Sequence, residues 1–315
     1  MTLKGLQSRR PIGVKKRAGF GWCYPVTNRL ALGTAQLALP YGISNEGNKV
    51  RDSEADAILD AAWEGGINTL DTAISYGECE HLLGKIGVGQ WQIISKLPKV
   101  PETCKDVASW VQDSVAGSIK RLKTSKLHGL LLHHPKQLLS PRGDELYRAL
   151  VSIQRAGRVE KIGLSIYGSD ELEAIWPQYQ FDLVQAPFNI LDRSLVLSGW
   201  LNKLRQAGTE VHVRSVFLQG LLLMDPVSRP KKFNRWQSLW DDWHSWLKDQ
   251  ALTPLQACLS FANSHPEINR VVVGVNSLQQ LKDILACDEK SVSIPPESLI
   301  CKDLNLINPS RWSMF

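Results

Sequence analysis

The 315-residue sequence lacks paired cysteines and long apolar runs, and each absence excludes a class of protein. Its six cysteines include no C-x-x-C pair. This scatter fits neither a disulfide framework nor a zinc knuckle, and it suits a reducing cytosol. No apolar run approaches the roughly 18 residues that a membrane span needs, and no hydrophobic signal segment follows the basic N-terminus. We therefore expect a cytoplasmic protein with no metal site and no membrane partner.

Acidic residues are absent from residues 1–17, which carry six of the 37 Lys and Arg residues. Removing those six leaves 31 basic residues against 31 acidic ones, so the net charge of +6 comes from this segment. A short basic segment is more often a solvated tail than a nucleic-acid arm. Pro11 and nearby glycines also interrupt the amphipathic helix of an organelle-targeting leader. We expect residues 1–17 to be a disordered tail with no nucleic-acid partner, ahead of a single domain at 18–315.

The dominant pattern is an alternation of short apolar runs with longer segments that have apolar residues at helical spacing. Eight strands, each followed by a helix, predict parallel pairing through right-handed crossovers. Helices are expected from 52 or 53 to 64 and at 107–122, 144–156, 198–207, 254–264 and 277–285, while 78–87 and 169–176 stay unassigned. The expected strands are 29–33, 67–71, 92–96, 129–133, 161–165, 183–186, 211–215 and 270–274.

The first strand is not followed by G-x-G-x-x-G, which argues against a dinucleotide-binding open sheet. Eight units can close, so we predict a (β/α)8 TIM barrel with residues 18–28 as a candidate cap over its bottom. The connection from 219 to 253, after the seventh strand, is too long for a plain link and predicts an elaboration at the active-site end. Trp236, Trp240, Trp243 and Trp246 lie there at helical spacing. They form either a stripe packed on the barrel, the simpler interpretation, or an aromatic wall of the pocket.

Polar, titratable residues end three consecutive expected strands. Asp71, Lys96 and His133 hold these positions, and Tyr76 follows Asp71 by five residues in a turn marked by Gly77. Each residue alone has an ordinary structural explanation, but carboxyl ends of barrel strands converge on one mouth. A phenol has a pKa near 10, which a nearby ammonium lowers. The set suits proton transfer to a carbonyl, and such a site needs a nicotinamide as the hydride donor.

The sequence segments around these residues resemble the aldo-keto reductase signature. The run from Gly66 to Ala73 (GINTLDTA), then Tyr76-Gly77 and Leu83-Gly84, is followed by ISK ending at Lys96 and LLHHP around His133. The resemblance covers about residues 29 to 286. It implies an NAD(P)H-dependent oxidoreductase that reduces an aldehyde or ketone, with Tyr76 as general acid, Lys96 and Asp71 as its tuning pair and His133 as the orienting residue. The motif proline two positions later favours His133 over His134.

The cofactor site that the resemblance implies departs from the family pattern. Ile166 stands where an asparagine is usual, and Arg214 lies near the usual place of a tyrosine that stacks on the nicotinamide. Arg214 could itself stack on that ring or pair with a carboxylate of the substrate or the protein. The expected cofactor-binding residues are Gly33, Thr34, Ser165, Gln185, Arg214, Ser215, Phe217, Gln219, Gly274, Asn276 and Gln280.

The segment from Val273 to Leu281 resembles the family's adenosine-phosphate loop. NADPH-preferring relatives often have Lys or Arg in it, whereas the corresponding positions here are Val275, Asn276 and Gln280. Arg270 and Lys282 are close in sequence but are expected to point elsewhere. A phosphate therefore lacks its best partner, a bidentate arginine. The family favours NADPH, and NADH stays possible.

Three rival functions stay open. A catalytically silent member of the fold would bind nucleotide as a sensor or regulatory subunit. A metal-dependent hydrolase would use His133, His134 and Asp71, although adjacent strand residues point to opposite faces. A sugar isomerase on the same fold would need a carboxylate pair at the strand ends that is missing here.

The substrate is a small carbonyl compound whose identity the sequence leaves open, as it does the oligomeric state. Specificity in this fold comes from rim loops, here 35–50, 219–253 and the segment after 287. Gln36 and Tyr41 are candidates to face the pocket or to pack within their loop. Arg214 near the mouth favours an acidic or sugar-like substrate.

Overall fold

Eight parallel strands form a closed barrel in the computed structural model, in the order β1 to β8. The structure describes residues 29–43, 49–287 and 293–314. The predicted barrel is confirmed, and each predicted strand overlaps an observed one. The strands are β1 (Leu30–Gly33), β2 (Thr69–Asp71), β3 (Gln92–Leu97), β4 (Leu127–Leu132), β5 (Val159–Ser165), β6 (Leu183–Pro187), β7 (Glu210–Arg214) and β8 (Arg270–Gly274).

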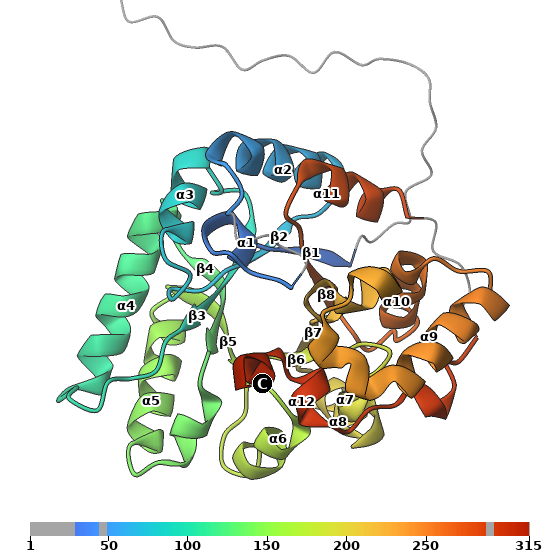
Figure 1. The fold of residues 1–315 in the computed structure, drawn as a ribbon. Coiled ribbons are helices and arrows are strands. Elements are labelled where there is room, and N and C mark those ends of the chain that lie inside the picture. Colours follow the sequence, from blue (N-terminus) through green and yellow to red (C-terminus); the bar gives the residue numbers. More distant parts are fainter. Residues whose placement is uncertain (1–28, 44–48, 288–292, 315) are drawn as a thin grey trace, which may run out of the picture.

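Helices surround this barrel on its outer side (Figure 1). The two links without a prediction are the short helices α3 and α6. The α-helices are α1 (Ala35–Ala38), α2 (Asp52–Glu64), α3 (Cys79–Ile86), α4 (Val107–Leu122), α5 (Gly143–Arg155), α6 (Ser169–Ile175), α7 (Ser194–Leu197), α8 (Trp200–Gln206), α9 (Gln237–Asp249), α10 (Pro254–Asn263), α11 (Leu278–Leu285) and α12 (Leu304–Ile307). Short 3-10 turns are η1 (Pro135–Leu139), η2 (Leu218–Leu223), η3 (Pro226–Ser228), η4 (Lys231–Trp236), η5 (Glu297–Leu299) and η6 (Pro309–Met314).

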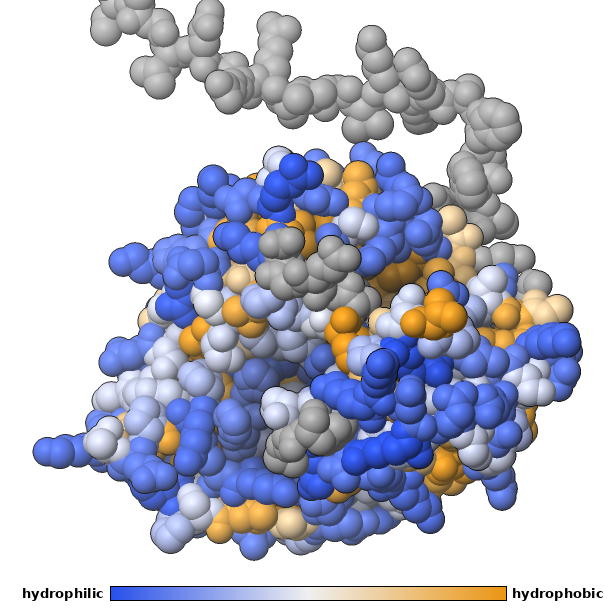
Figure 2. Space-filling view, viewed as in Figure 1, coloured by the Kyte–Doolittle hydropathy of each residue, from blue (hydrophilic) through white to orange (hydrophobic). Residues whose placement is uncertain are grey.

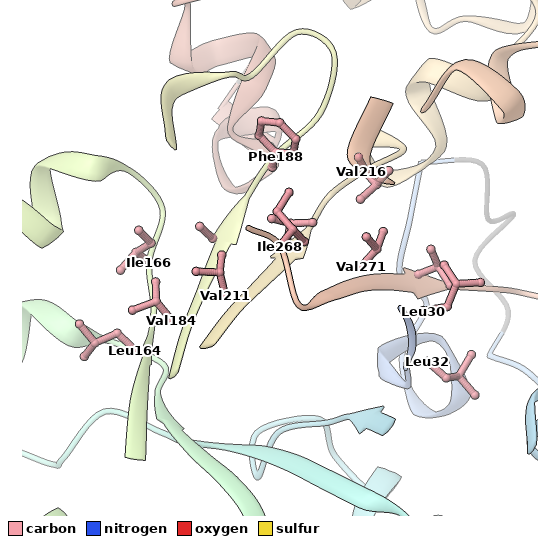
Figure 3. Close-up of a cluster of buried hydrophobic side chains, with 14 of the residues drawn as sticks. Leu30, Leu32, Leu164, Ile166, Val184, Phe188, Val211, Val216, Ile268 and Val271 are labelled. Atoms are coloured by element: carbon pink, nitrogen blue, oxygen red, sulfur yellow. The ribbon is translucent and has the colours of Figure 1, made fainter. Parts of the chain in front are cut away.

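The main core lies between the strands and the outer helices. Strand residues such as Leu32, Leu164, Val184, Val211 and Val271 are buried in it (Figure 3). Successive strand residues point to opposite faces of the sheet. The residues between these apolar ones therefore point into the barrel, and they include the polar residues of the site.

The barrel interior has its own apolar layer. Ile94, Leu131 and Leu183 form a buried cluster separate from the main core. Gly163 makes room for it, because a Cβ there would lie 2.1 Å from the Leu183 carbonyl oxygen and 2.6 Å from Leu131 Cδ2. Lys96 and Gln185 lie two positions after Ile94 and Leu183, so they share the same inward face one layer higher. The apolar layer of Ile94, Leu131 and Leu183 is therefore the floor of the site.

The long connection after β7 forms the predicted elaboration, which consists of η2, η3, η4 and α9. Trp240, Trp243 and Trp246 are buried against the core, and Trp236 packs on it. The Trp240 indole donates to the Phe233 carbonyl at 2.9 Å. The packed-stripe interpretation is thus confirmed.

Two other predictions depend on the ends of the chain. The basic tail at 1–17 and the cap at 18–28 lie outside the described residues. Within the described ranges, no helix combines the length and the apolar character that crossing a membrane requires.

Candidate active site

A buried ion pair lies at the carboxyl ends of β2 and β3. Lys96 Nζ is 2.7 Å from Asp71 Oδ1 and donates to the Thr72 carbonyl at 2.9 Å. The side chain of Gln185, on β6 across the barrel, donates to Asp71 Oδ2 at 2.6 Å. Asp71 is 6% exposed and Lys96 1%. Both carboxylate oxygens therefore have donors, which orients Asp71 and Lys96 rigidly.

Tyr76 lies over this pair, in the turn that follows β2. The Lys96 ammonium is 5.3 Å from the centroid of its ring, and the turn closes with a Tyr76 N–H bond to the Ala73 carbonyl at 3.0 Å. Burial first, and the Asp71 carboxylate second, raise the pKa of Tyr76 well above its ordinary value. The expectation that a neighbouring ammonium lowers this pKa is wrong here, because Asp71 neutralises Lys96 and the phenol is desolvated. Tyr76 is a protonated phenol at neutral pH.

His133 completes the group from one residue beyond the end of β4. Its ring centroid lies 6.1 Å from that of Tyr76, edge-on, and Nδ1 lies 3.3 Å from Ser75 Oγ. Burial, with Lys96 next, lowers the pKa of His133 to about 4. The imidazole is thus neutral at pH 7 and can act as a hydrogen-bond donor without carrying a charge. The structure brings all four predicted catalytic residues together.

A cavity of about 470 Å³ extends from this group toward the loop between β8 and α11. Asp71 and Tyr76 line one end, and Gln280, Asp283 and Ile284 line the other. Such a volume is typical of small-ligand and cofactor sites. Among the predicted cofactor residues, those that line it are Gly33, Thr34, Arg214, Ser215, Phe217, Gln219, Gly274, Asn276 and Gln280.

Ser165 and Gln185 do not line this cavity. Both are buried in the barrel at paired positions of β5 and β6. Ile166, where the family pattern has an asparagine, is fully buried and donates its backbone N–H to the Gln185 carbonyl at 2.9 Å. Gln185 Oε1 is buried and has no hydrogen-bond partner among the described residues. An unpartnered buried acceptor of this kind is costly unless a ligand donates to it.

The loop after β7 is strained where it borders the cavity. The backbone φ values of Ser215, Leu218 and Gln219 are 61°, 47° and 54°. Residues other than glycine seldom adopt this left-handed region. Asn189 Nδ2 donates to the Ser215 carbonyl at 3.1 Å, and the Ile43 N–H donates to the Gln219 carbonyl at 3.1 Å. Strain of this kind gathers at functional sites, where the surrounding contacts maintain it.

Arg214 is bound within the protein. Its guanidinium donates to the Ile166 carbonyl at 2.9 Å and to Ser215 Oγ at 3.3 Å. It also lies 4.8 Å from the centroid of the Tyr167 ring. The guanidinium thus lies over a tyrosine of the chain itself, while the alternatives of stacking on the nicotinamide or pairing with a carboxylate stay predictions.

Two further hollows lie near the catalytic group, and His133 lines the first of them. One of about 800 Å³ is lined by His133, Tyr167 and residues after β3 and β4. Another of about 400 Å³ is lined by Tyr167, Arg214 and the C-terminal segment around Cys301. The face seen in Figure 2 is hollowed near its centre, with mostly hydrophilic side chains around the hollow. These spaces are candidates for the substrate.

Some lining residues were not predicted as site residues. Asp225, Leu255 and Asp283 border the cavity, and Tyr167 borders both further hollows. The one sequence signal for Tyr167 is that it follows apolar Ile166, so the two side chains are expected to point in opposite directions. Gln36 and Tyr41, left between two interpretations, do line the cavity. The described residues contain no cluster of three candidate metal ligands, which removes the support for the hydrolase alternative.

Comparisons with known proteins agree with this geometry. The profile of the aldo/keto reductase family matches residues 29–294. The chain is 28% identical to D-threo-aldose 1-dehydrogenase of a Pseudomonas species over 255 residues, 67% of this chain and 76% of that protein. It is 23% identical to pyridoxal 4-dehydrogenase of Microbacterium luteolum, covering 84% and 90% of the two chains. The holo form of an aldo-keto reductase from Bacillus halodurans has the same fold, with a TM-score of 0.69, 18% identity, and coverage of 87% and 94%.

Proposed function

This chain belongs to the aldo/keto reductase family, whose chemistry is carbonyl oxidoreduction, and we propose that it reduces an aldehyde or ketone to an alcohol with Tyr76 as the proton donor. The observation that carries the proposal is the position of the Tyr76 phenol over the buried Asp71–Lys96 pair, beside neutral His133. The same residues would serve the reverse oxidation, with tyrosinate as the base.

The residues fit a nicotinamide dinucleotide as cofactor. Gln185 does not line the cavity, but its buried Oε1 lies beside Asp71 without a partner among the described residues and would accept the N–H of a carboxamide that reached it. The cavity continues from Tyr76 to Asn276 and Gln280, which would hold the nucleotide end. When bound, the dihydronicotinamide supplies the hydride. The family resemblance favours NADPH, whereas the residues at the far end of the cavity favour NADH.

In the proposed reaction, Tyr76 Oη donates its proton to the carbonyl oxygen while the carbonyl carbon receives the hydride. The electron pair of the C=O π bond becomes the new O–H bond, and Tyr76 is left as tyrosinate. The Lys96 ammonium, held in place by Asp71, offsets part of the cost of that buried tyrosinate, although burial and the Asp71 carboxylate keep the net pKa of Tyr76 raised. Neutral His133 donates a hydrogen bond to the same carbonyl oxygen and orients it. Because its pKa is raised, Tyr76 takes up a proton again after the reaction and returns to the phenol.

Replacement of the phenol tests the proposal. Tyr76→Phe keeps the ring over Lys96 but removes the proton donor, so kcat should fall by about 10²- to 10⁴-fold while dinucleotide affinity is kept. A panel of an aldose, pyridoxal and a short 2-oxo acid covers the polar substrates suggested by the relatives' names and by Arg214. Unchanged carbonyl reduction in Tyr76→Phe would refute the role of Tyr76. Dinucleotide binding without turnover by the wild-type protein on any carbonyl tested would favour the silent sensor instead.

A further inference from the structure

The far end of the cavity carries negative charge. Asp283, on α11 one turn after Gln280, lines it there, and Asp225 lies elsewhere in the same wall. Arg214, the only Lys or Arg among the described lining residues, lies at the catalytic end. The cavity extends from Tyr76 to Asn276, Gln280 and Asp283. A dinucleotide with its nicotinamide beside Tyr76 would therefore place its adenosine at this far end. An additional phosphate on the adenosine ribose would meet carboxylates there.

Three backbone donors at this end are already in use. The first turn of a helix is a natural anion site because its amides lack partners within the helix. At the start of α11, however, the Leu278 N–H donates to Glu54 Oε1 at 3.3 Å. The Gln280 N–H donates to Ser277 Oγ at 3.2 Å, and the Asn276 N–H donates to Gln280 Oε1 at 2.8 Å.

Glu54 does not itself line the cavity, but its carboxylate takes up a first-turn amide of α11 that a phosphate could otherwise use. It projects from the first turn of α2, which packs beside α11 (Figure 1). Arg51 pairs with Glu54 at 3.9 Å, and the Arg51 side chain is 85% exposed. Arg270 does not contribute, since its guanidinium bonds to Thr69 Oγ1 at 3.2 Å, on the other side of the barrel's apolar layer.

We infer that this site selects NADH over NADPH, with Glu54 at the first turn of α11 and Asp283 in the cavity wall as the residues that exclude the 2′-phosphate. The inference rests on the proposed nicotinamide function. The 2′-phosphate carries about two negative charges at neutral pH. Its approach to two carboxylates, with no arginine or lysine among the described residues at this end of the wall to pair with it, is repulsive and desolvating.

The experiment is calorimetric titration of the full-length protein with NADH and with NADPH at low ionic strength. NADH should bind at least roughly tenfold more tightly. The ratio should shrink as salt is added, because added ions screen charges separated by about 10 Å at 0.1 M. Glu54→Gln and Asp283→Asn should each shrink the ratio severalfold by improving NADPH binding alone, and Gln280→Arg should reverse it by supplying a bidentate phosphate partner.

Asp56→Asn is the matched control, since it removes one negative charge from an exposed position of the same helix α2. Equal affinities for the two dinucleotides, or tighter NADPH binding, would overturn the inference and leave the proposed function intact. Equal effects of Glu54→Gln and Asp56→Asn would refute the specific role of Glu54. No binding of either dinucleotide would instead refute the proposed function itself.

Discussion

Lys96 Nζ lies 2.7 Å from Asp71 Oδ1, and both side chains are almost fully buried at the carboxyl end of the barrel. The pair is joined to the opposite wall because Gln185 donates to the second oxygen of Asp71. A buried ion pair adds little net stability when compared with apolar residues of similar volume. The role of this ion pair is therefore to orient the Lys96 ammonium beneath the ring of Tyr76.

The stability costs of removing the two members of the pair should not be additive. Lys96→Met leaves the Asp71 carboxylate buried with only Gln185, and should lower the free energy of unfolding by about 3–5 kcal/mol. Asp71→Asn leaves the Lys96 ammonium with only the Thr72 carbonyl and should cost a similar amount. The double variant should cost clearly less than the sum. Chemical denaturation of the four proteins measures this coupling, and additive costs would mean that the pair does not interact.

The barrel could be predicted from the sequence because its strands are short apolar runs between glycine and polar segments. The end of β8, at Gly274, was placed to the residue. The helices α3 and α6 could not be predicted, since eight and seven residues give too few turns for a clear apolar period. Strand ends also indicated the site: Asp71 and Lys96 lie at or next to the ends of β2 and β3.

Properties of the site that depend on distant parts of the chain could not be predicted. The direction of the Tyr76 pKa shift follows from burial, which no local pattern reports. The contact between Arg214 and Tyr167 joins the end of β7 to the loop after β5. Glu54 reaches the start of α11 across 224 residues of sequence. A sequence pattern indicates which residues share one helix or strand, whereas these contacts depend on how two separate elements pack together.

A methyl group at Gly163 should destabilise the barrel. The new Cβ would lie 2.1 Å from a carbonyl oxygen of β6, which is backbone and cannot rotate away. Overpacking of this kind costs about 1–3 kcal/mol or more. Gly163→Ala should lower the unfolding midpoint, measured by thermal denaturation with circular dichroism. The control is Gly89→Ala, where a Cβ would meet no atom within 4 Å. Equal behaviour of the two variants would contradict the tight packing at Gly163.

His133 should make stability depend on pH in the acid range. Its pKa is lowered to about 4 in the folded protein from an ordinary 6.5, so the unfolded chain takes up the proton first. As the pH falls from 6.5 to 4, the free energy of unfolding should therefore decrease, by no more than about 3 kcal/mol because the ring is only partly buried. Below pH 4 this contribution is constant.

The measurement is urea denaturation between pH 3.5 and 7.5 for the wild type and His133→Gln. The difference between the two curves should change with pH only in the window from about 4 to 6.5. The imidazole resonance that disappears in His133→Gln should titrate near pH 4 in the wild type. Titration of that resonance near 6.5 would contradict the burial of His133.

The ring of Tyr167 should matter more than its hydroxyl, because the ring supports the guanidinium of Arg214. Tyr167→Phe keeps the face beneath Arg214 and should leave carbonyl reduction nearly unchanged. Tyr167→Ala removes that face, which should cost about 0.5–1 kcal/mol in stability for a partly exposed cation–π pair. It should also lower kcat/KM severalfold, since Arg214 then keeps only its bonds to Ile166 and Ser215. Steady-state kinetics and denaturation of both variants decide the matter. If Tyr167→Phe proved as harmful as Tyr167→Ala, the hydroxyl and not the stacked ring would be the functional group.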